Sequence, residues 1–290
     1  FLQGGASLQF SAIPLNLLGK NSKADYIDTG IWSEKASKEA QRYGDINVIK
    51  AATLLDAKHA ITDQSIWNLS DNAAYVHYAD NETIGGLQFA AIPEVAAPLV
   101  CDYSSSILSA PLDVSKFGLI YAGAQKNIGP AGLTIVIIRD DLLDQAKAEI
   151  PSILKYADQA KNGSMVNTPA TYSWYLSGLV FEWLLEQGGV DAMYQTNLAK
   201  ANLLYGYIDG SDFYNNPIAI ANRSIMNVPF TLADEALEKT FLKEAEQNQL
   251  LNLAGHRSVG GMRASIYNAV PLEGVQALVS FMDDFAKRYA

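Results

Sequence analysis

The sequence GLIYAGAQKNIGPAGLTIVII, residues 118–138, places a lysine between two apolar runs. The runs at 118–123 and 133–138 each predict a buried strand. Lys126 lies between them in a loop of small residues. An amine in such a partly desolvated position loses its proton more easily and can form an imine. A lone lysine in a turn is more often a surface residue, so the prediction of chemistry needs partners.

Asp102 is the first such partner, because it also ends an apolar run, Pro98 to Cys101. Ligands bind at the carboxyl edge of open α/β sheets, where both side chains are expected to project. A carboxylate there can hold a protonated pyridine nitrogen while Lys126 holds an aldehyde, the pairing expected for pyridoxal phosphate. The alternative is that Asp102 only caps the turn that follows.

The order of apolar runs and helical patterns predicts an α/β fold. Continuous apolar strands among helices are typical of a mixed, mainly parallel sheet covered on both faces. We expect a large domain at 1–187 and a smaller α+β domain at 188–290. The expected strands include 24–30, 47–49, 73–78, 97–101 and 223–230, and the expected helices are 33–43, 172–185, 190–207, 234–247 and 275–289.

The first residues, FLQGGASLQF, predict the end of a buried strand, a small-residue loop and a helix. Backbone N–H groups and the Ser7 hydroxyl in such a loop can bind a phosphate. The pattern is weak by itself, and it is not the dinucleotide-binding glycine motif.

The composition limits the possible partners. The chain has 290 residues, is 49% hydrophobic and carries a formal net charge of −10. This charge argues against a general nucleic-acid or anionic-membrane binder, although it leaves room for a local basic pocket. The single cysteine fits a reducing compartment, and neither a signal peptide nor a membrane-spanning run is apparent, so we expect a cytoplasmic protein. No metal ligands are predicted.

Residues 113–143, DVSKFGLIYAGAQKNIGPAGLTIVIIRDDLL, closely resemble the phosphoserine aminotransferases, a class V family of fold-type I pyridoxal-phosphate enzymes. The resemblance implies transfer of an amino group from L-glutamate to 3-phosphohydroxypyruvate, giving O-phospho-L-serine and 2-oxoglutarate in serine biosynthesis. It also permits a role in pyridoxine biosynthesis. Further segments resemble the family in the expected order: GGASLQFSAIPLNLL, ADYIDTGIWSEKASKEA, VHYADNETIGGLQF, VNTPATYSWY and GHRSVGGMRASIYNA.

The resemblance also assigns roles to single residues around pyridoxal 5'-phosphate. Lys126 would form the Schiff base, and Asp102 would pair with the pyridine nitrogen. Trp32 would stack on the ring, although an aromatic residue there is otherwise expected in the core, and Thr83 would bond the ring hydroxyl. The phosphate would be held by Ala6, Ser7 and Gln125, and the neighbouring subunit's phosphate by Asn167 and Thr168.

The reach of Asn167 and Thr168 into a neighbouring site implies a homodimer with cofactor sites at the subunit interface. Without the family, Asn-Thr-Pro is only a loop and helix-start signal. On the substrate side, Arg263 would bind the α-carboxylate, while His256 and Arg257 would bind the distal phosphate or carboxylate. Arginine suits such anions because it presents a planar fork of donors. The alternative is a solvated basic turn.

The chain departs from the family pattern in two places. Family members carry a further segment ahead of GGAS, including a His-Arg pair, so we expect this chain to be the interior of a longer aminotransferase. Ser7 stands where some members have Arg. The alternatives are another class V aminotransferase or a catalytically incompetent fragment. A desulfurase would need a cysteine on a mobile loop, whereas Cys101 lies in an apparent buried strand.

Overall fold

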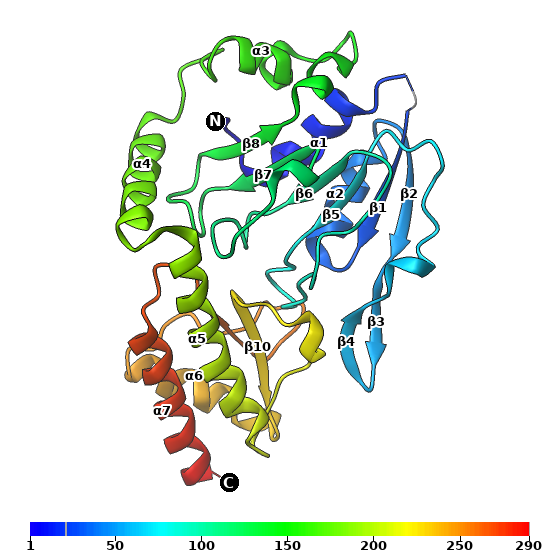
Figure 1. The fold of residues 1–290 in the computed structure, drawn as a ribbon. Helices are drawn as coiled ribbons and strands as arrows, with labels where there is room; N and C mark the ends of the chain where they lie inside the picture. Colours follow the sequence, from blue (N-terminus) through cyan, green and yellow to red (C-terminus); the bar gives the residue numbers. More distant parts are fainter. Residues whose placement is uncertain (21, 290) are drawn as a thin grey trace.

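A six-stranded sheet forms the centre of the larger part of the protein (Figure 1). The computed structural model describes residues 1–20 and 22–289, so Ala290, the last residue of the predicted second domain, lies outside it. The strands follow the order β2-β1-β5-β6-β7-β8. Their bounds are β1 Lys23–Asp28, β2 Asp45–Lys50, β5 Val76–Ala79, β6 Leu99–Asp102, β7 Leu119–Gly123 and β8 Thr134–Ile138.

Neighbouring strands of this sheet are parallel except for β7 and β8. The connection from Gly123 to Thr134 is too short for the crossover that a parallel pair needs, so β8 returns antiparallel. The prediction of a mixed, mainly parallel sheet is therefore confirmed.

Both faces of the sheet are buried. Tyr26 and Tyr121 belong to one apolar cluster, with the helices α1 (Gly5–Leu17) and α2 (Ile31–Ala40) packed against it. Their sequence neighbours Ile27 and Ile120 belong to a second cluster, because successive strand side chains point to opposite faces. Burial on both faces explains why the central strands β6 and β7 are mostly apolar.

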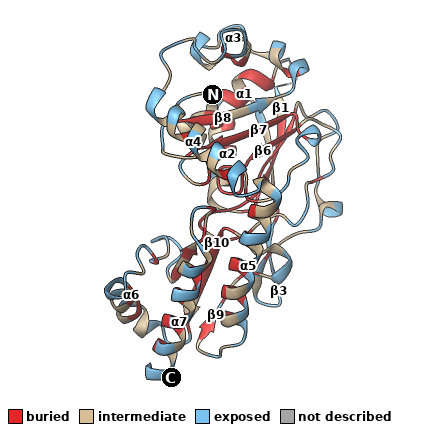
Figure 2. Cartoon of the chain, turned by 60° about the vertical axis from the view of Figure 1, so that its left-hand side comes forward, coloured by how far each residue is buried: buried red, intermediate tan, exposed pale blue. Residues whose placement is uncertain are grey.

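A second unit has its own core (Figure 2). Phe230, Phe241 and Phe285 lie at the centre of its apolar cluster. Its antiparallel sheet has the order β11-β10-β9. The elements are α5 Gly189–Asp209, β9 Tyr214–Asn215, β10 Asn227–Leu232, α6 Glu238–Gln247, β11 Met262–Ser265 and α7 Leu272–Tyr289.

Several elements differ from the expectation or were missed. The strand expected from Arg223 begins only at Asn227, because the Ser224 hydroxyl accepts hydrogen bonds from the Met226 and Asn227 N–H groups and forms a turn. The expected strand at the chain start is a single antiparallel bridge between Leu2 and Thr134. The hairpin β3 (Ala52–Leu55) and β4 (Lys58–Ile61) and the helix α3 (Tyr156–Lys161) were not predicted.

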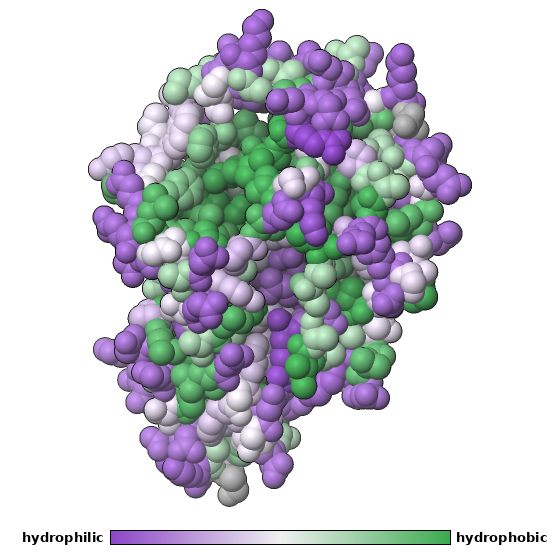
Figure 3. Space-filling model, in the orientation of Figure 1, coloured by the Kyte–Doolittle hydropathy of each residue, from purple (hydrophilic) through white to green (hydrophobic). Residues whose placement is uncertain are grey.

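The helix α4 (Thr171–Glu186) leads from the large sheet to α5. It exposes the large side chains Tyr172, Tyr175, Leu179 and Leu185. Apolar residues gather on the α4 side of the upper half of the molecule (Figure 3). Within 1–20 and 22–289, no helix combines the length and apolar character that a bilayer crossing requires.

Candidate active site

Four predicted site residues follow the carboxyl ends of adjacent parallel strands. Lys126 comes three residues after β7, and Asp102 is the last residue of β6. Thr83 follows β5, and Trp32 lies in the first turn of α2, directly after β1. Because the four strands are parallel neighbours, these residues meet at one edge of the sheet. The topology thus supports the predicted grouping.

Lys126 is the centre of this group. Its Nζ donates a hydrogen bond of 2.7 Å to Thr83 Oγ1 and lies 6.0 Å from the centroid of the Trp32 ring. Burial lowers the pKa of the Lys126 amine to about 8, while the Asp102 carboxylate acts in the opposite direction. A large fraction of the amine is therefore neutral at mildly alkaline pH, as a nucleophile requires.

Asp102 is a buried carboxylate in the same group. One oxygen accepts a hydrogen bond of 2.8 Å from the Ser104 N–H. Burial raises the pKa of Asp102, and the bonds from Ser104 and the nearby Lys126 amine oppose that rise. The Ser104 bond is a turn contact, so Asp102 caps the turn that follows it, and its place at the sheet edge leaves the predicted pairing with a pyridine nitrogen as a prediction.

Glu82 is a residue of this region that sequence reasoning missed. It is 1% exposed, and its carboxylate accepts hydrogen bonds from the backbone N–H groups of Trp32 and Ser33, each 2.9 Å long. The residue precedes Thr83 in the stretch Asn81-Glu82-Thr83, but α2 is 50 positions away, so no local pattern could reveal the contact.

Ala6 and Ser7 lie in the first turn of α1. Gly4, the residue before the helix, has φ 91°, a backbone conformation that glycine adopts readily. The N–H groups of a first helical turn have no partner within the helix, and the helix dipole favours an anion there. This geometry suits the predicted phosphate site.

Three other predicted phosphate ligands are exposed. Gln125 lies next to Lys126, while Asn167 and Thr168 lie in the loop before α4. The Gln3 side-chain amide donates to Asn167 Oδ1 at 3.3 Å and to the Thr168 carbonyl at 2.9 Å. The loop therefore lies beside the residue that precedes Gly4-Gly5, with its own polar groups open to solvent.

The predicted substrate ligands divide into two groups. Arg263 lies on β11, is half-buried, and its charge lowers the pKa of Lys126. His256 and Arg257 are instead exposed in the preceding turn, where His256 Nδ1 lies 2.6 Å from Ser258 Oγ. The structure thus brings Arg263 toward Lys126 and leaves His256 and Arg257 at the surface.

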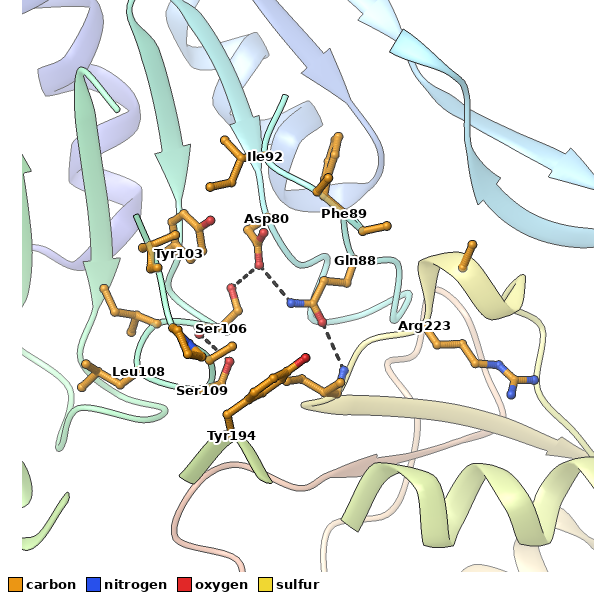
Figure 4. Close-up of a pocket in the computed structure, with 18 residues that line it drawn as sticks. Asp80, Gln88, Phe89, Ile92, Tyr103, Ser106, Leu108, Ser109, Tyr194 and Arg223 are labelled. Atoms are coloured by element: carbon orange, nitrogen blue, oxygen red, sulfur yellow. Dashed lines mark hydrogen bonds between the residues drawn. The ribbon is translucent and has the colours of Figure 1, made fainter. Parts of the chain in front are cut away.

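A cavity of about 300 Å³ lies where the large sheet meets the second unit (Figure 4). Asp80 accepts hydrogen bonds there from Ser106 Oγ at 2.5 Å and from Gln88 Nε2 at 3.1 Å. Gln88 Oε1 in turn accepts from the Ile225 N–H at 3.1 Å. Burial raises the pKa of Asp80 to about 6. None of the predicted site residues lines this cavity.

The donor set around Lys126 fits pyridoxal 5'-phosphate. The site offers an amine for the aldehyde, a buried carboxylate for the pyridine nitrogen, an aromatic ring for stacking and a helix N-terminus for the phosphate. Trp32 Nε1 and Arg263 Nε are buried without a hydrogen-bond partner among the described residues, so both can donate to a ligand. Within that same part of the chain, no cluster of three or more His, Cys, Asp or Glu residues could hold a metal ion.

Comparison with known proteins agrees with this geometry. The model of the family "Aminotransferase class-V" matches residues 1–278. The chain is 88% identical to a phosphoserine aminotransferase of Acinetobacter baumannii, covering 99% of this chain and 80% of the relative. It is 64% identical to one of Azotobacter vinelandii, again covering 80% of the relative.

Solved structures lead to the same family. The phosphoserine aminotransferase of Bacillus circulans subsp. alkalophilus superposes with a TM-score of 0.95 at 46% identity, over 100% of this chain and 80% of that chain. The PLP-bound phosphoserine aminotransferase of Trichomonas vaginalis gives a TM-score of 0.91 at 43% identity, over 97% of this chain and 81% of that chain.

The fold and the site define a pyridoxal-phosphate-dependent aminotransferase of class V and fold type I. Within that class, the chain belongs to the phosphoserine aminotransferase family. It spans about 80% of the length of these relatives.

Proposed function

We propose that this protein transfers the amino group of L-glutamate to 3-phosphohydroxypyruvate, giving 2-oxoglutarate and O-phospho-L-serine. The observation that carries the proposal is the group of Lys126, Thr83 and Asp102 at one edge of the large sheet, with the charge of Arg263 acting on Lys126 from β11, in a chain 88% identical to a phosphoserine aminotransferase. When bound, pyridoxal 5'-phosphate supplies an aldehyde that takes up amino groups and a ring that accepts electrons.

Four residues of the site have separate roles in proton transfer and in holding the cofactor ring. Lys126 Nζ, with its lowered pKa, would move a proton between the substrate Cα and the carbon that bears the cofactor aldehyde in each half-reaction. Asp102 keeps the pyridine nitrogen protonated, because a carboxylate beside that nitrogen favours its charged form. Trp32 covers the ring, and Thr83 bonds the ring hydroxyl.

The anionic groups of cofactor and substrate are held by separate donors. The N–H groups of Ala6 and Ser7, with the Gln125 side chain, hold the cofactor phosphate. Arg263 holds the substrate α-carboxylate in a bidentate pair. His256 and Arg257 bind the distal phosphate of the acceptor or the distal carboxylate of glutamate. One basic pocket can serve both substrates because each distal group is an anion.

The proposal includes a homodimer, in which Asn167 and Thr168 reach the phosphate site of the partner. The exposed polar loop and the apolar α4 surface beside it, with Tyr172, Tyr175 and Leu179, support this assembly. We also propose the division into domains 1–187 and 188–290, supported by the separate apolar cores, and a cytoplasmic location with roles in serine and pyridoxine biosynthesis.

The test is amino transfer from L-glutamate to three acceptors by the cofactor-loaded protein. We expect kcat/KM for 3-phosphohydroxypyruvate to exceed that for pyruvate or glyoxylate by about a hundredfold or more, because only the first acceptor satisfies the basic pocket. A preference for glyoxylate or pyruvate would identify another class V aminotransferase. A protein that binds the cofactor but transfers nothing to any acceptor would contradict the proposal.

A further inference from the structure

Helix α2 has an unusual N-terminus, because Gly30, the residue before it, offers no side chain to cap the first N–H groups. Capping residues usually supply this acceptor from within the chain segment itself. Here Glu82 supplies it from a distant loop. Its Oε2 accepts from the Trp32 N–H at 2.9 Å, and its Oε1 accepts from the Ser33 N–H at 2.9 Å and from the Ser33 hydroxyl at 2.7 Å.

The contact requires glycine at position 30. A Cβ at Gly30 would lie 2.7 Å from Glu82 Cδ and 2.8 Å from Cγ, closer than carbon atoms approach in proteins. The backbone of Gly30 is extended, so space rather than backbone freedom explains the glycine. The Ser33 hydroxyl also accepts from the Thr29 and Gly30 N–H groups at 2.9 and 3.0 Å, which fixes the turn between β1 and α2.

The loop that holds Glu82 also holds a predicted cofactor ligand. Thr83, the next residue, accepts the 2.7 Å hydrogen bond from Lys126 Nζ. The loop is itself closed by bonds from the Glu82 N–H to the Leu87 carbonyl at 2.8 Å and from the Gly86 N–H to the Glu82 carbonyl at 2.7 Å. Glu82 and Thr83 therefore join the backbone of Trp32 to the amine of Lys126 through one short, braced segment.

The charge of Glu82 suits this place. The carboxylate is buried, and burial raises its pKa, while the hydrogen bonds from Ser33 and Trp32 oppose the rise. A helix N-terminus favours a negative charge, so the dipole of α2 stabilises the ionised form. The group has no cation as a direct partner among the ion pairs of the described residues; its partners are the N–H and O–H groups of α2.

We propose that Glu82 is a positioning residue for the cofactor ring. By capping α2, it fixes the Trp32 side chain relative to Lys126 and Thr83, so that the pyridine ring can bind beside all three residues. The inference rests on the proposed function only in taking that ring as the ligand. It assigns Glu82 no direct contact with cofactor or substrate.

The test measures binding of pyridoxal 5'-phosphate to the apoprotein in the absence of substrate. The readouts are quenching of tryptophan fluorescence, the visible circular dichroism of the bound cofactor and the melting temperature. Glu82→Gln keeps the size of the side chain but replaces one acceptor oxygen by an amide NH2 group. Two donors then face each other at one of the α2 N–H groups. We expect binding to weaken about tenfold, as loss of a helix cap implies, and the dichroism per bound cofactor to fall.

The matched control is Glu34→Gln on the same helix. Glu34 forms an exposed pair with Lys38 and does not contact the α2 N–H groups that Glu82 caps. We expect cofactor binding and dichroism to stay within about twofold of the wild type, because exposed pairs contribute little. A purely structural role for Glu82 would lower the melting temperature without changing the dichroism of the cofactor that remains bound, and that result would overturn the proposal.

A second variant separates the cap from the glutamate itself. In Gly30→Asp with Glu82→Ala, an aspartate at the usual capping position can enter the space that the glutamate leaves. We expect this double variant to bind the cofactor within about threefold of the wild type, whereas Gly30→Asp alone disrupts binding because of the close contact.

If Glu82→Gln does not fold, the double variant Gly30→Asp with Glu82→Ala becomes the test. Failure of this double variant to fold or to bind the cofactor would overturn the proposal. Because binding is measured without substrate, a wild-type protein that binds the cofactor as expected but transfers no amino group would contradict the proposed function and leave this inference intact.

Discussion

The backbone N–H of Asn268 donates a 3.0 Å hydrogen bond to the side-chain Oδ1 of Asn127, the residue that follows Lys126. Asn127 Nδ2 donates to the Ile107 carbonyl at 2.9 Å, and the Asn268 side chain donates to the Leu108 carbonyl at 2.9 Å. Asn268 follows β11, which carries Arg263. A small set of buried amides thus fixes the strand that carries Arg263 relative to the loop that carries Lys126.

Replacement of Asn127 by alanine should therefore loosen this junction. We expect the free energy of unfolding to fall by about 1–3 kcal/mol, because the buried partners of the amide lose their hydrogen bonds. We also expect KM for glutamate to rise more than kcat falls, since Arg263 moves relative to Lys126. Denaturant unfolding and steady-state kinetics check both. The same substitution at exposed Asn248 serves as the control, and equal kinetic effects there would refute this coupling.

Lys126→Met should abolish amino transfer and still stabilise the apoprotein. The pKa of Lys126 is about 8 in the folded state against an ordinary 10.5, so the unfolded chain binds more protons between these values. The stability of the wild type therefore rises as pH increases from about 8 to about 10.5, and below pH 8 the amine destabilises the fold. We expect the variant to gain about 1–3 kcal/mol at pH 7, after loss of the Thr83 hydrogen bond.

Urea unfolding at pH 7 and pH 10 measures this difference. The gain should shrink at the higher pH, whereas Lys116→Met, at an exposed position, should show no such dependence. An equal or lower stability of Lys126→Met at pH 7 would mean that the amine is not destabilised by burial.

Asp102→Asn should reduce kcat by about 10²–10³-fold, the effect of removing a preorganised electrostatic partner from an active site. Because the carboxylate raises the pKa of Lys126, the variant should also lower that pKa below about 8. The rate of cofactor uptake by the apoprotein as a function of pH reports the amine directly. An unchanged pH profile would mean that the Asp102 charge does not affect the pKa of Lys126, and that Asp102 serves only as a turn cap.

Arg263→Met should move the same pH profile in the opposite direction. The arginine charge lowers the pKa of Lys126, so its removal should raise that pKa above about 8. KM for glutamate should rise about tenfold or more, since a charge-assisted pair to the α-carboxylate is lost. Arg139→Met is the control, because Arg139 forms an exposed pair with Asp141. A shift in KM without a shift in the pH profile would place Arg263 farther from the amine than the structure has it.

The sequence alone was sufficient to predict a mixed, mainly parallel sheet and to predict that Asp102 and Lys126 lie at the ends of its strands. Lys126 and Asp102 follow apolar runs, and buried parallel strands are typically such continuous apolar runs. The hairpin β3–β4 could not be found in this way, because β3 is exposed along its whole length and its sequence, Ala-Thr-Leu-Leu, neither alternates strictly nor forms a continuous apolar run. Glu82 was missed for another reason. It caps a helix 50 positions away, and Gly30 before that helix gives no sign in the sequence that a distant side chain supplies the cap.

Borohydride reduction of the cofactor-loaded protein, followed by tryptic digestion and mass spectrometry, identifies the residue that carries the cofactor. Trypsin cannot cut after a modified lysine, so we predict a peptide from Phe117 to Arg139 that bears the cofactor on Lys126. Cofactor on another residue, such as the buried Lys200, together with an unmodified peptide ending at Lys126, would show that Lys126 does not carry the cofactor.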